Sequence, residues 1–415
     1  MKRLALLALT LAACTPIYIP DTQPDHTPEY EDLNLERLAK MFAALPIDAS
    51  HLQEVYDAVG ASSGNGYDEE YTMDRLIAAP GSGVGSAPGT RSARSYENPL
   101  RNLIRDYLES NAPTKASVED LLEQLSQSDY QLYWPYSEDW DGTTYPIITF
   151  DPGFGAESNY GYAISFLEDG TRVADSVYVD EGVAKRRPVW VLNSNSDAAF
   201  TPLEFFTKSS APTLRTGGCE AAANGPEEAS GRLWPLRTGG RGASSGPEPE
   251  ASDIAPQLKH RRLMLKSLKM LRNYDTWFGG ASEFWIKCGS ADGFVGSTEE
   301  ELKLFTPSVT DFVVVVKRKH VGKALPFEAI LVSDFTSQID KLAFLVTEDD
   351  GGTRTTWKCD ATVKIQSKAY GITLDLPYNQ KDDIVWRGQL AARFFEEEDV
   401  VRGRFGDVEI EFELE

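Results

Sequence analysis

Histidine is scarce in this chain, and the few copies are widely separated. The four histidines are His26, His51, His260 and His320. No two of them have the i, i+4 spacing that places two zinc ligands on one helix face. The sequence therefore indicates no zinc centre and no histidine-based triad.

Cysteine is almost as rare, with four copies in 415 residues. One of them, Cys14, belongs to the amino-terminal signal described below, which leaves Cys219, Cys288 and Cys359. An odd number excludes a complete disulfide framework. Cys288 and Cys359 both lie in strand-like segments, so two alternatives stay open: they pair in an oxidising compartment, or they remain free.

Positive charge is in short supply, with 41 Lys and Arg against 64 Asp and Glu and a net charge of -23. Such a chain is repelled by polyanions, so nucleic acid is excluded as a partner and anionic lipid is a poor one. The charge favours solubility and does not specify a fold.

Catalytic motifs are missing as well. The pattern G-x-S-x-G occurs around Ser62 and around Ser244. A nucleophile elbow needs a strand before that serine and a helix after it, and neither copy has this context. The spacing of an EF-hand calcium loop does not occur either. We therefore expect no catalytic residue and no enzymatic activity.

Long apolar runs are absent too, and the longest stretch near the start is informative. Lys2 and Arg3 precede an apolar run over residues 4–13. This run is far shorter than the roughly 20 residues that span a bilayer. A basic start followed by a short apolar segment is typical of a signal peptide, which we assign to residues 1–13.

The end of that run, Leu11-Ala12-Ala13-Cys14, resembles the lipobox of bacterial lipoproteins. The resemblance implies diacylglyceryl transfer to the Cys14 thiol, cleavage before Cys14 and acylation of its new amino group. Several acyl chains make anchoring stable. Position 15 holds Thr15 and not the aspartate that favours inner-membrane retention, so we expect an outer membrane lipoprotein.

Residues 14–28 contain evenly spaced prolines and acids, which predicts an extended tether. From residue 30 the apolar spacing becomes helical, and strand-like segments follow at 131–134, 145–150, 160–166 and 189–192. This order predicts an α+β domain over residues 29–206.

Residues 207–256 are dominated by Gly, Ser, Ala, Pro and Glu, a composition that cannot bury a core and predicts a disordered linker. Short strand-like segments then recur with little helix between them, at 284–288, 312–317, 327–332, 342–346, 361–365, 370–376, 389–395 and 408–414. This spacing predicts an all-β domain over residues 257–415, a β-sandwich of the immunoglobulin or C2-like type.

Acidic loops in this second domain suggest one binding hypothesis. Glu348, Asp349 and Asp350 precede a Gly-Gly turn, and Asp382 and Asp383 precede another strand. If the two loops meet, their carboxylate oxygens form a calcium site. The alternative is a plain hairpin turn beside a solvated charged loop, with no cofactor at all.

Aromatic residues suggest a second hypothesis. Trp134, Tyr136 and Trp140 lie among acidic residues, and exposed rings flanked by carboxylates bind glycans by stacking. The edge of a buried β-core has the same appearance in sequence.

Three phrases of the sequence, at residues 132–138, 279–284 and 348–352, resemble uncharacterised lipoproteins of Gram-negative bacteria that contain domains of unknown function. The resemblance implies no activity. We expect a membrane-anchored envelope lipoprotein that binds or scaffolds a glycan or an envelope protein. The alternatives are a calcium-stabilised adhesion module and a glycan hydrolase whose acid pair is assembled only in three dimensions.

Overall fold

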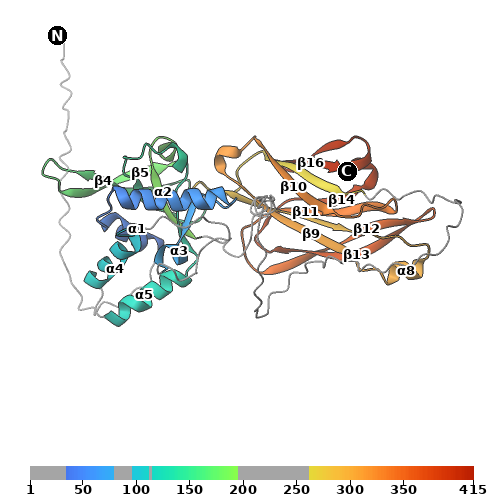
Figure 1. Ribbon diagram of the computed structural model, residues 1–415, viewed down its shortest axis with the longest axis horizontal. Helices are drawn as coiled ribbons and strands as arrows, with labels where there is room; N and C mark the ends of the chain where they lie inside the picture. Colours follow the sequence, from blue (N-terminus) through green and yellow to red (C-terminus); the bar gives the residue numbers. More distant parts are fainter. Residues whose placement is uncertain (1–33, 79–95, 112–114, 195–260) are drawn as a thin grey trace, which may run out of the picture. The chain divides into compact units, whose positions relative to one another are not determined.

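The computed structural model describes residues 34–78, 96–111, 115–194 and 261–415 (Figure 1). The predicted signal peptide, Cys14, the tether and the linker 207–256 lie outside these residues. Across the described ranges, no helix combines the length and the apolar character that a membrane span requires.

The first part of the chain is rich in helices, as its apolar spacing predicts. They are α1 (Leu35–Ala44), α2 (Ala49–Gly64), α3 (Met73–Ile77), α4 (Leu100–Asn111) and α5 (Lys115–Gln127). Helix α2 begins with a reciprocal cap, because the Asp48 carboxylate accepts the amide of His51 and the His51 ring accepts the amide of Asp48. The amides of His51 and of the cap residue Asp48 thereby both gain a partner.

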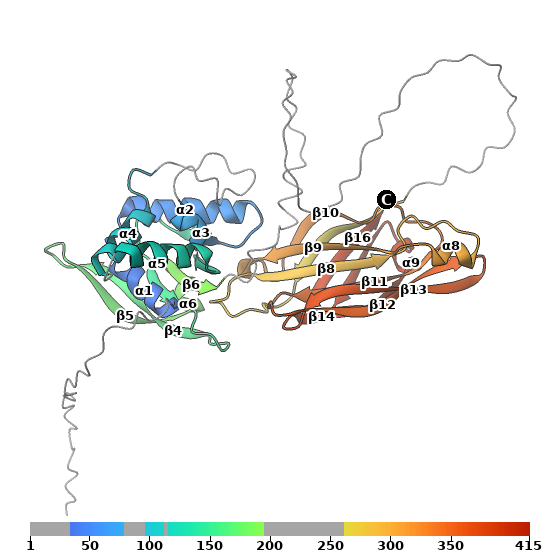
Figure 2. The same ribbon diagram turned by 90° about the horizontal axis from the view of Figure 1, so that it is seen from below.

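These helices accompany one mixed sheet in the order β1-β2-β6-β3-β4-β5. Its strands are β1 (Glu70–Thr72), β2 (Tyr130–Tyr133), β3 (Ile147–Phe150), β4 (Ser158–Phe166), β5 (Arg172–Asp180) and β6 (Val189–Ser194). Only β3 and β6 run parallel. Helix α1 contacts β3, β4 and β6, and Figure 2 shows the helices gathered on one face of this sheet.

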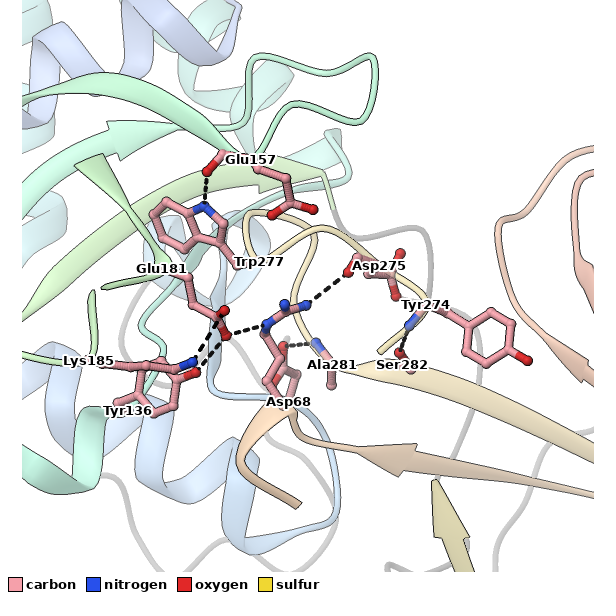
Figure 3. Close-up of polar contacts among 11 residues, drawn as sticks. Asp68, Tyr136, Glu157, Glu181, Lys185, Tyr274, Asp275, Trp277, Ala281 and Ser282 are labelled. Atoms are coloured by element: carbon pink, nitrogen blue, oxygen red, sulfur yellow. Dashed lines mark hydrogen bonds and ion pairs between the residues drawn. The ribbon is translucent and has the colours of Figure 1, made fainter. Parts of the chain in front are cut away.

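The opposite face of the sheet is covered from far along the chain. Trp277 and Phe278, fully buried, pack against Val179, Val189 and Val191 together with α6 (Glu181–Ala184). The Trp277 indole donates to the carbonyl of Glu157 over 2.9 Å (Figure 3). The first sheet thus completes its core with residues that follow the linker, and residues Leu35–Glu415 form one compact unit.

The second part of the chain is built from antiparallel strands, so the predicted order of an α+β region followed by an all-β region is confirmed. One sheet has the order β10-β7-β16-β15, and the other has the order β13-β12-β11-β8-β9 with β14 paired to β11. The strands are β7 (Leu263–Met270), β8 (Ser282–Ser290), β9 (Ser308–Val316), β10 (Ala324–Val332), β11 (Ile339–Glu348), β12 (Arg354–Ile365), β13 (Lys368–Asn379), β14 (Asp383–Ala391), β15 (Val400–Phe405) and β16 (Val408–Leu414). Three short helices join them: α8 (Glu299–Lys303), η2 (Arg318–His320) and α9 (Ala392–Glu396).

The two sheets share one core, and strand β11 lies at its centre. Phe344 of β11 packs with Phe412 of β16 in the common core. Ala343 and Leu345, on the other face of β11, pack against Leu374 of the β12–β13 hairpin. Strand β11 is therefore covered on both faces, which explains its continuous apolar run over residues 342–346.

The strand predicted over residues 389–395 ends earlier than expected. Strand β14 stops at Ala391 and the chain continues as helix α9. Ala392 and Phe395 lie three positions apart, so one helical turn buries both in the core. Cys288 and Cys359 are free in the structure, which decides between the two alternatives for this pair.

Opposite charges alternate across the outer side of the β10-β7-β16-β15 sheet. Lys266 of β7 lies 3.1 Å from Glu328 of β10 and 3.1 Å from Glu413 of β16. Arg402 of β15 lies 2.6 Å from Glu411 of β16. Each exposed pair contributes little alone, but a network across several strands favours this strand order.

The hairpin packing predicts the effect of a small substitution. A Cβ atom at Gly289 of β8 would lie 2.4 Å from Leu374 Cδ1 and 3.3 Å from Leu374 Cγ, so Gly289→Ala forces the buried Leu374 side chain to shift. We expect a loss of about 1–3 kcal/mol in the free energy of unfolding, measured by urea denaturation. The control is Gly60→Ala in helix α2, where a Cβ meets nothing within 4 Å and alanine should be neutral or stabilising. Equal effects of the two substitutions would contradict this packing.

Candidate functional site

A basic segment after β9 reaches the acidic residues of the first part of the chain. The guanidinium of Arg318 is almost fully buried, with its Nε 3.0 Å from Glu181 Oε1 and its Nη1 donating to the carbonyl of Asp275. Figure 3 shows Tyr136 and Lys185 gathered at the same Glu181 carboxylate, which Tyr136 reaches with a 2.8 Å hydrogen bond. A buried cation is thus matched by a carboxylate that two further donors hold in place.

Asp68 strengthens the same junction from the loop before β1. Its Oδ2 accepts the amide of Ala281 over 2.9 Å (Figure 3). Burial raises the pKa of Asp68, and the nearby ammonium groups of Lys317 and Lys319 oppose that shift. A second carboxylate therefore binds the segment that carries Trp277 and Phe278.

Lys319 places its ammonium between two carboxyl groups, Glu69 and Glu138. Its Nζ lies 3.2 Å from Glu69 Oε1 and forms a short ion pair with Glu138 Oε1. Each of the two carboxyl groups also shifts the pKa of the other. Neighbouring carboxyl groups share one proton more readily than they carry two negative charges, so the two acids titrate as a pair.

The two acids of this pair have pKa values displaced in opposite directions. Burial raises the pKa of Glu69 to about 8, and its hydrogen bond to Glu138 adds to the shift. Burial opposes ionisation of Glu138 too, but hydrogen bonds from Glu69 and Lys319 outweigh it and lower its pKa to about 2. At neutral pH Glu69 is therefore the protonated donor and Glu138 the ionised acceptor.

This acid pair lines an open cleft of about 420 Å³ beside helix α2. The wall consists of an aromatic ring, small residues, hydroxyl groups and charged groups: Tyr56, Asp57, Gly60, Ala61, Ser63, Glu69, Ser137, Glu138 and Lys319. Helix α2 presents Tyr56 and Asp57 on successive positions near its middle, and η1 (Ser137–Asp139) presents Glu138 opposite them. We name these residues the carboxylate cleft.

The aromatic residues proposed for glycan binding occupy three different settings. Trp134 is completely buried and stacks edge-on against Trp190. Tyr136 is engaged with Glu181 and adopts a left-handed backbone conformation with φ 58°. Trp140 is partly exposed, and its ring lies 5.3 Å from that of Tyr56. Trp134 and Trp140 both contact the Tyr56 ring of the carboxylate cleft, and of these two Trp140 is the one with exposed surface.

The acidic loops proposed for calcium do come together. Strands β11 and β14 pair so that Glu348 lies opposite Asp383. Asp349 accepts the side-chain amide of Asn379 and the indole of Trp285, and it hydrogen-bonds Asp382, whose pKa burial raises to about 6. The hydrogen-bond partners of Asp349 named here are all side chains of the protein itself.

Glu348 takes part in a separate acidic group. Its carboxylate lies within 4.8 Å of those of Asp275 and Glu283. Burial raises the pKa of Asp275 to about 6, the hydrogen bond to Glu348 lowers it, and the charge of Asp350 raises it further. The five predicted calcium ligands are therefore divided between two groups, and calcium binding stays a prediction.

Sequence reasoning missed most of the carboxylate cleft. Glu69 lies in a short acidic run with no motif, and Tyr56 lies in a helical segment whose apolar spacing indicates only a core face. Residues 317–319 form a basic cluster at the end of a strand, a pattern that indicates no particular site. These residues come together only in the folded chain, since Lys319 is 250 positions from Glu69 and 181 from Glu138 in the sequence.

Comparisons with protein-family models, curated proteins and solved structures find no match for this chain. The site is therefore interpreted from its own geometry.

The shared proton predicts a specific dependence of stability on pH. The pKa of Glu69 is higher in the folded chain than the usual 4.5, so folding takes up a proton and its stabilising contribution falls as the pH rises from about 5 to 8. Glu138 has a lowered pKa, so its contribution is lost in the opposite direction, as the pH falls toward 2. Glu69→Gln keeps the neutral hydrogen-bonding side chain, and we expect it to remove the alkaline loss.

The measurement is the free energy of unfolding in urea at several pH values between 5 and 8. The difference between wild type and Glu69→Gln should change by at most about 1.4 kcal/mol per pH unit. Glu36→Gln on the exposed face of α1 serves as the control and should not alter the pH slope. A Glu69→Gln curve parallel to wild type would mean that Glu69 does not retain its proton.

The calcium prediction has its own test. If the acidic loops bind calcium, the melting temperature of the full chain should rise on addition of calcium and fall back with EGTA, because a ligand that binds only the folded state stabilises it. Asp349→Asn should abolish the rise. A melting temperature unchanged by calcium and by chelator would remove this prediction.

Proposed function

We propose that this chain is a lipoprotein of the bacterial outer membrane, anchored by lipid on Cys14. The support is the basic start, the short apolar run and the lipobox-like Leu11-Ala12-Ala13-Cys14. The strong negative charge fits a protein held at a membrane by acyl chains and not by attraction to anionic headgroups. In this proposal the described residues are the cargo and the proline-spaced residues 14–28 are the tether.

The anchor is tested by fractionation of cells that express the full chain. Cys14→Ala should release the protein from the membrane fraction, whereas Cys359→Ala, which changes a half-buried cysteine of the β-rich part, should leave it there. Globomycin should block processing of the wild type. If Cys14→Ala stayed in the membrane fraction, the anchoring proposal would be contradicted.

We further propose that the anchored protein binds a short glycan in the carboxylate cleft. The observation that carries this proposal is the combination of the Tyr56 ring with the Glu69–Glu138–Lys319 group in one open cleft. An aromatic ring offers a stacking face for the C–H side of a sugar, and charged groups with fixed directions accept and donate to its hydroxyl groups. A cleft with one ring and several convergent polar groups is the usual form of a small-molecule site.

The geometry of this cleft fits glycan binding better than glycan hydrolysis. Glycoside hydrolases separate their two carboxyl groups by about 5 Å or more, which leaves room for the sugar or a water molecule. Glu69 and Glu138 instead both bind the Lys319 ammonium, which occupies the space between them. We therefore assign them to ligand recognition and propose no catalytic step.

In the same proposal the second part of the chain is a β-sandwich of the immunoglobulin or C2-like type that acts as a scaffold. Its support is the shared core of the two antiparallel sheets. This scaffold contributes Lys319 to the cleft, so the recognition surface depends on both parts of the chain.

Glycan binding is tested with a glycan array followed by calorimetry on the best ligand. Tyr56→Ala should weaken binding roughly 10-fold or more, since stacking of this kind contributes on the order of 1–2 kcal/mol. Glu138→Gln should weaken it through loss of a charged acceptor. Tyr160→Ala, which removes an exposed tyrosine outside the cleft, is the matched control. A chain that binds no glycan on the array would remove this part of the proposal.

A further inference from the structure

One face of the β4–β5 hairpin carries exposed aromatic rings. Tyr160 lies opposite Tyr178 in the register, and Phe166 shares their face because it has the same parity as Tyr160 along β4. This is the face that carries α1, since Arg172, opposite Phe166, donates to the carbonyl of Ala43 at the end of that helix. The side chains of Tyr160, Tyr178 and Phe166 are nevertheless 65%, 54% and 49% exposed. Exposed rings gathered on one sheet face mark an interaction surface.

The same face has little charge, in a chain with 64 acidic residues. Among the described residues of β4 and β5 on this side, the charged ones are Arg172 and Asp180. Arg172 is bound to α1, and the Asp180 carboxylate accepts the amide of Val183 as the cap of α6. Asp175 points to the opposite face, as its odd position in β5 requires. We name six residues of this face the aromatic shelf: Tyr160, Tyr162, Phe166, Ala174, Ser176 and Tyr178.

The direction of α1 places the start of that helix beside the shelf. Lys40 of α1 interacts electrostatically with Tyr162 in the middle of β4. Ala43, about one helical turn later, accepts the side chain of Arg172 at the far end of the hairpin. Helix α1 therefore runs in the same direction as β4 and begins near the start of that strand. The chain that precedes Leu35 joins the fold at the aromatic shelf.

We propose that the aromatic shelf rests on the lipid surface to which Cys14 is anchored. This inference rests on the proposed anchor and adds an orientation to it. Cys14 lies 20 positions before Asn34, and a flexible chain of that length spans roughly 25 Å. The shelf is therefore held close to the membrane, where even a weak contact is populated because the effective concentration is high. The occupant is lipid because the uncharged face of an acidic domain adjoins the entry of the anchored chain.

The side chains of the shelf suit a zwitterionic lipid surface. Tyr160 and Tyr178 form an edge-to-face pair with ring centroids 6.2 Å apart. Tyrosine is enriched at membrane interfaces, because its ring is apolar and its hydroxyl group reaches the headgroups. The exposed Glu168 and Asp169 at the turn of the hairpin are repelled by anionic headgroups, so the shelf favours lipids without net charge.

Two matched probe sites test this contact in the full, lipidated chain. Ser176→Cys places a thiol on the shelf, and Ser165→Cys places one on the opposite face of the same hairpin, where the side chain is also exposed. Each is combined with Cys219→Ser and Cys359→Ser, labelled with the fluorophore NBD and reconstituted in phosphatidylcholine vesicles that contain nitroxide-labelled phosphatidylcholine. The nitroxide should quench the probe at position 176 several-fold more strongly than the probe at position 165.

Removal of the exposed rings separates this contact from the anchor. Tyr160→Ser together with Tyr178→Ser should abolish most of the extra quenching at position 176, while the lipid keeps the protein on the vesicles. Equal quenching at the two positions in vesicle-bound protein, or quenching unchanged by the double substitution, would overturn the contact and leave the anchor intact. A chain that does not associate with the vesicles at all would overturn the anchor, and this inference with it.

Discussion

The burial of Trp277 and Phe278 under the first sheet is the interaction on which the rest of this structure depends. Burying a large apolar side chain contributes about 1.5–3 kcal/mol, and both rings lie in one core cluster with the valines of β5 and β6. The backbone around them is tied down as well, since Asn193 donates to the carbonyls of Phe278 and Gly279. Two aromatic rings thus make one unit of regions separated by the linker.

Once that contact forms, the charges at the junction follow from it. Strand β8, which follows Trp277, pairs with β9, which precedes the basic segment. Burial of Trp277 under the first sheet therefore brings Arg318 and Lys319 against the acids of the first part. Removing a carboxylate from water is unfavourable, and Glu69 meets this constraint by keeping its proton while Glu138 stays ionised beside Lys319. The polarity of the cleft is therefore a consequence of how the two regions pack.

Most helices and strands could be predicted from the sequence, but a few could not. Helix α4 follows apolar spacing because burial of one face imposes a period on the chain, and β11 is a continuous apolar run because both of its faces are covered. Strand β5 was missed, since its exposed middle shows little alternation, and α9 was expected as strand because its apolar residues suit either state. Trp134 was proposed as a ligand platform, yet it is entirely enclosed, since a ring beside acids in sequence need not lie beside them in space.

By itself the sequence determined the kind of region at each point, an α+β part and then an all-β part, and the strongly acidic charge of the chain. Those properties are local or additive, so they can be summed along the chain. The tertiary structure alone decided that Tyr56, Glu69, Glu138 and Lys319 share a cleft, and that Glu348 faces Asp275 and not its neighbour Asp349. These contacts join residues far apart in the chain. They depend on tertiary packing, which leaves no periodic pattern in a single sequence.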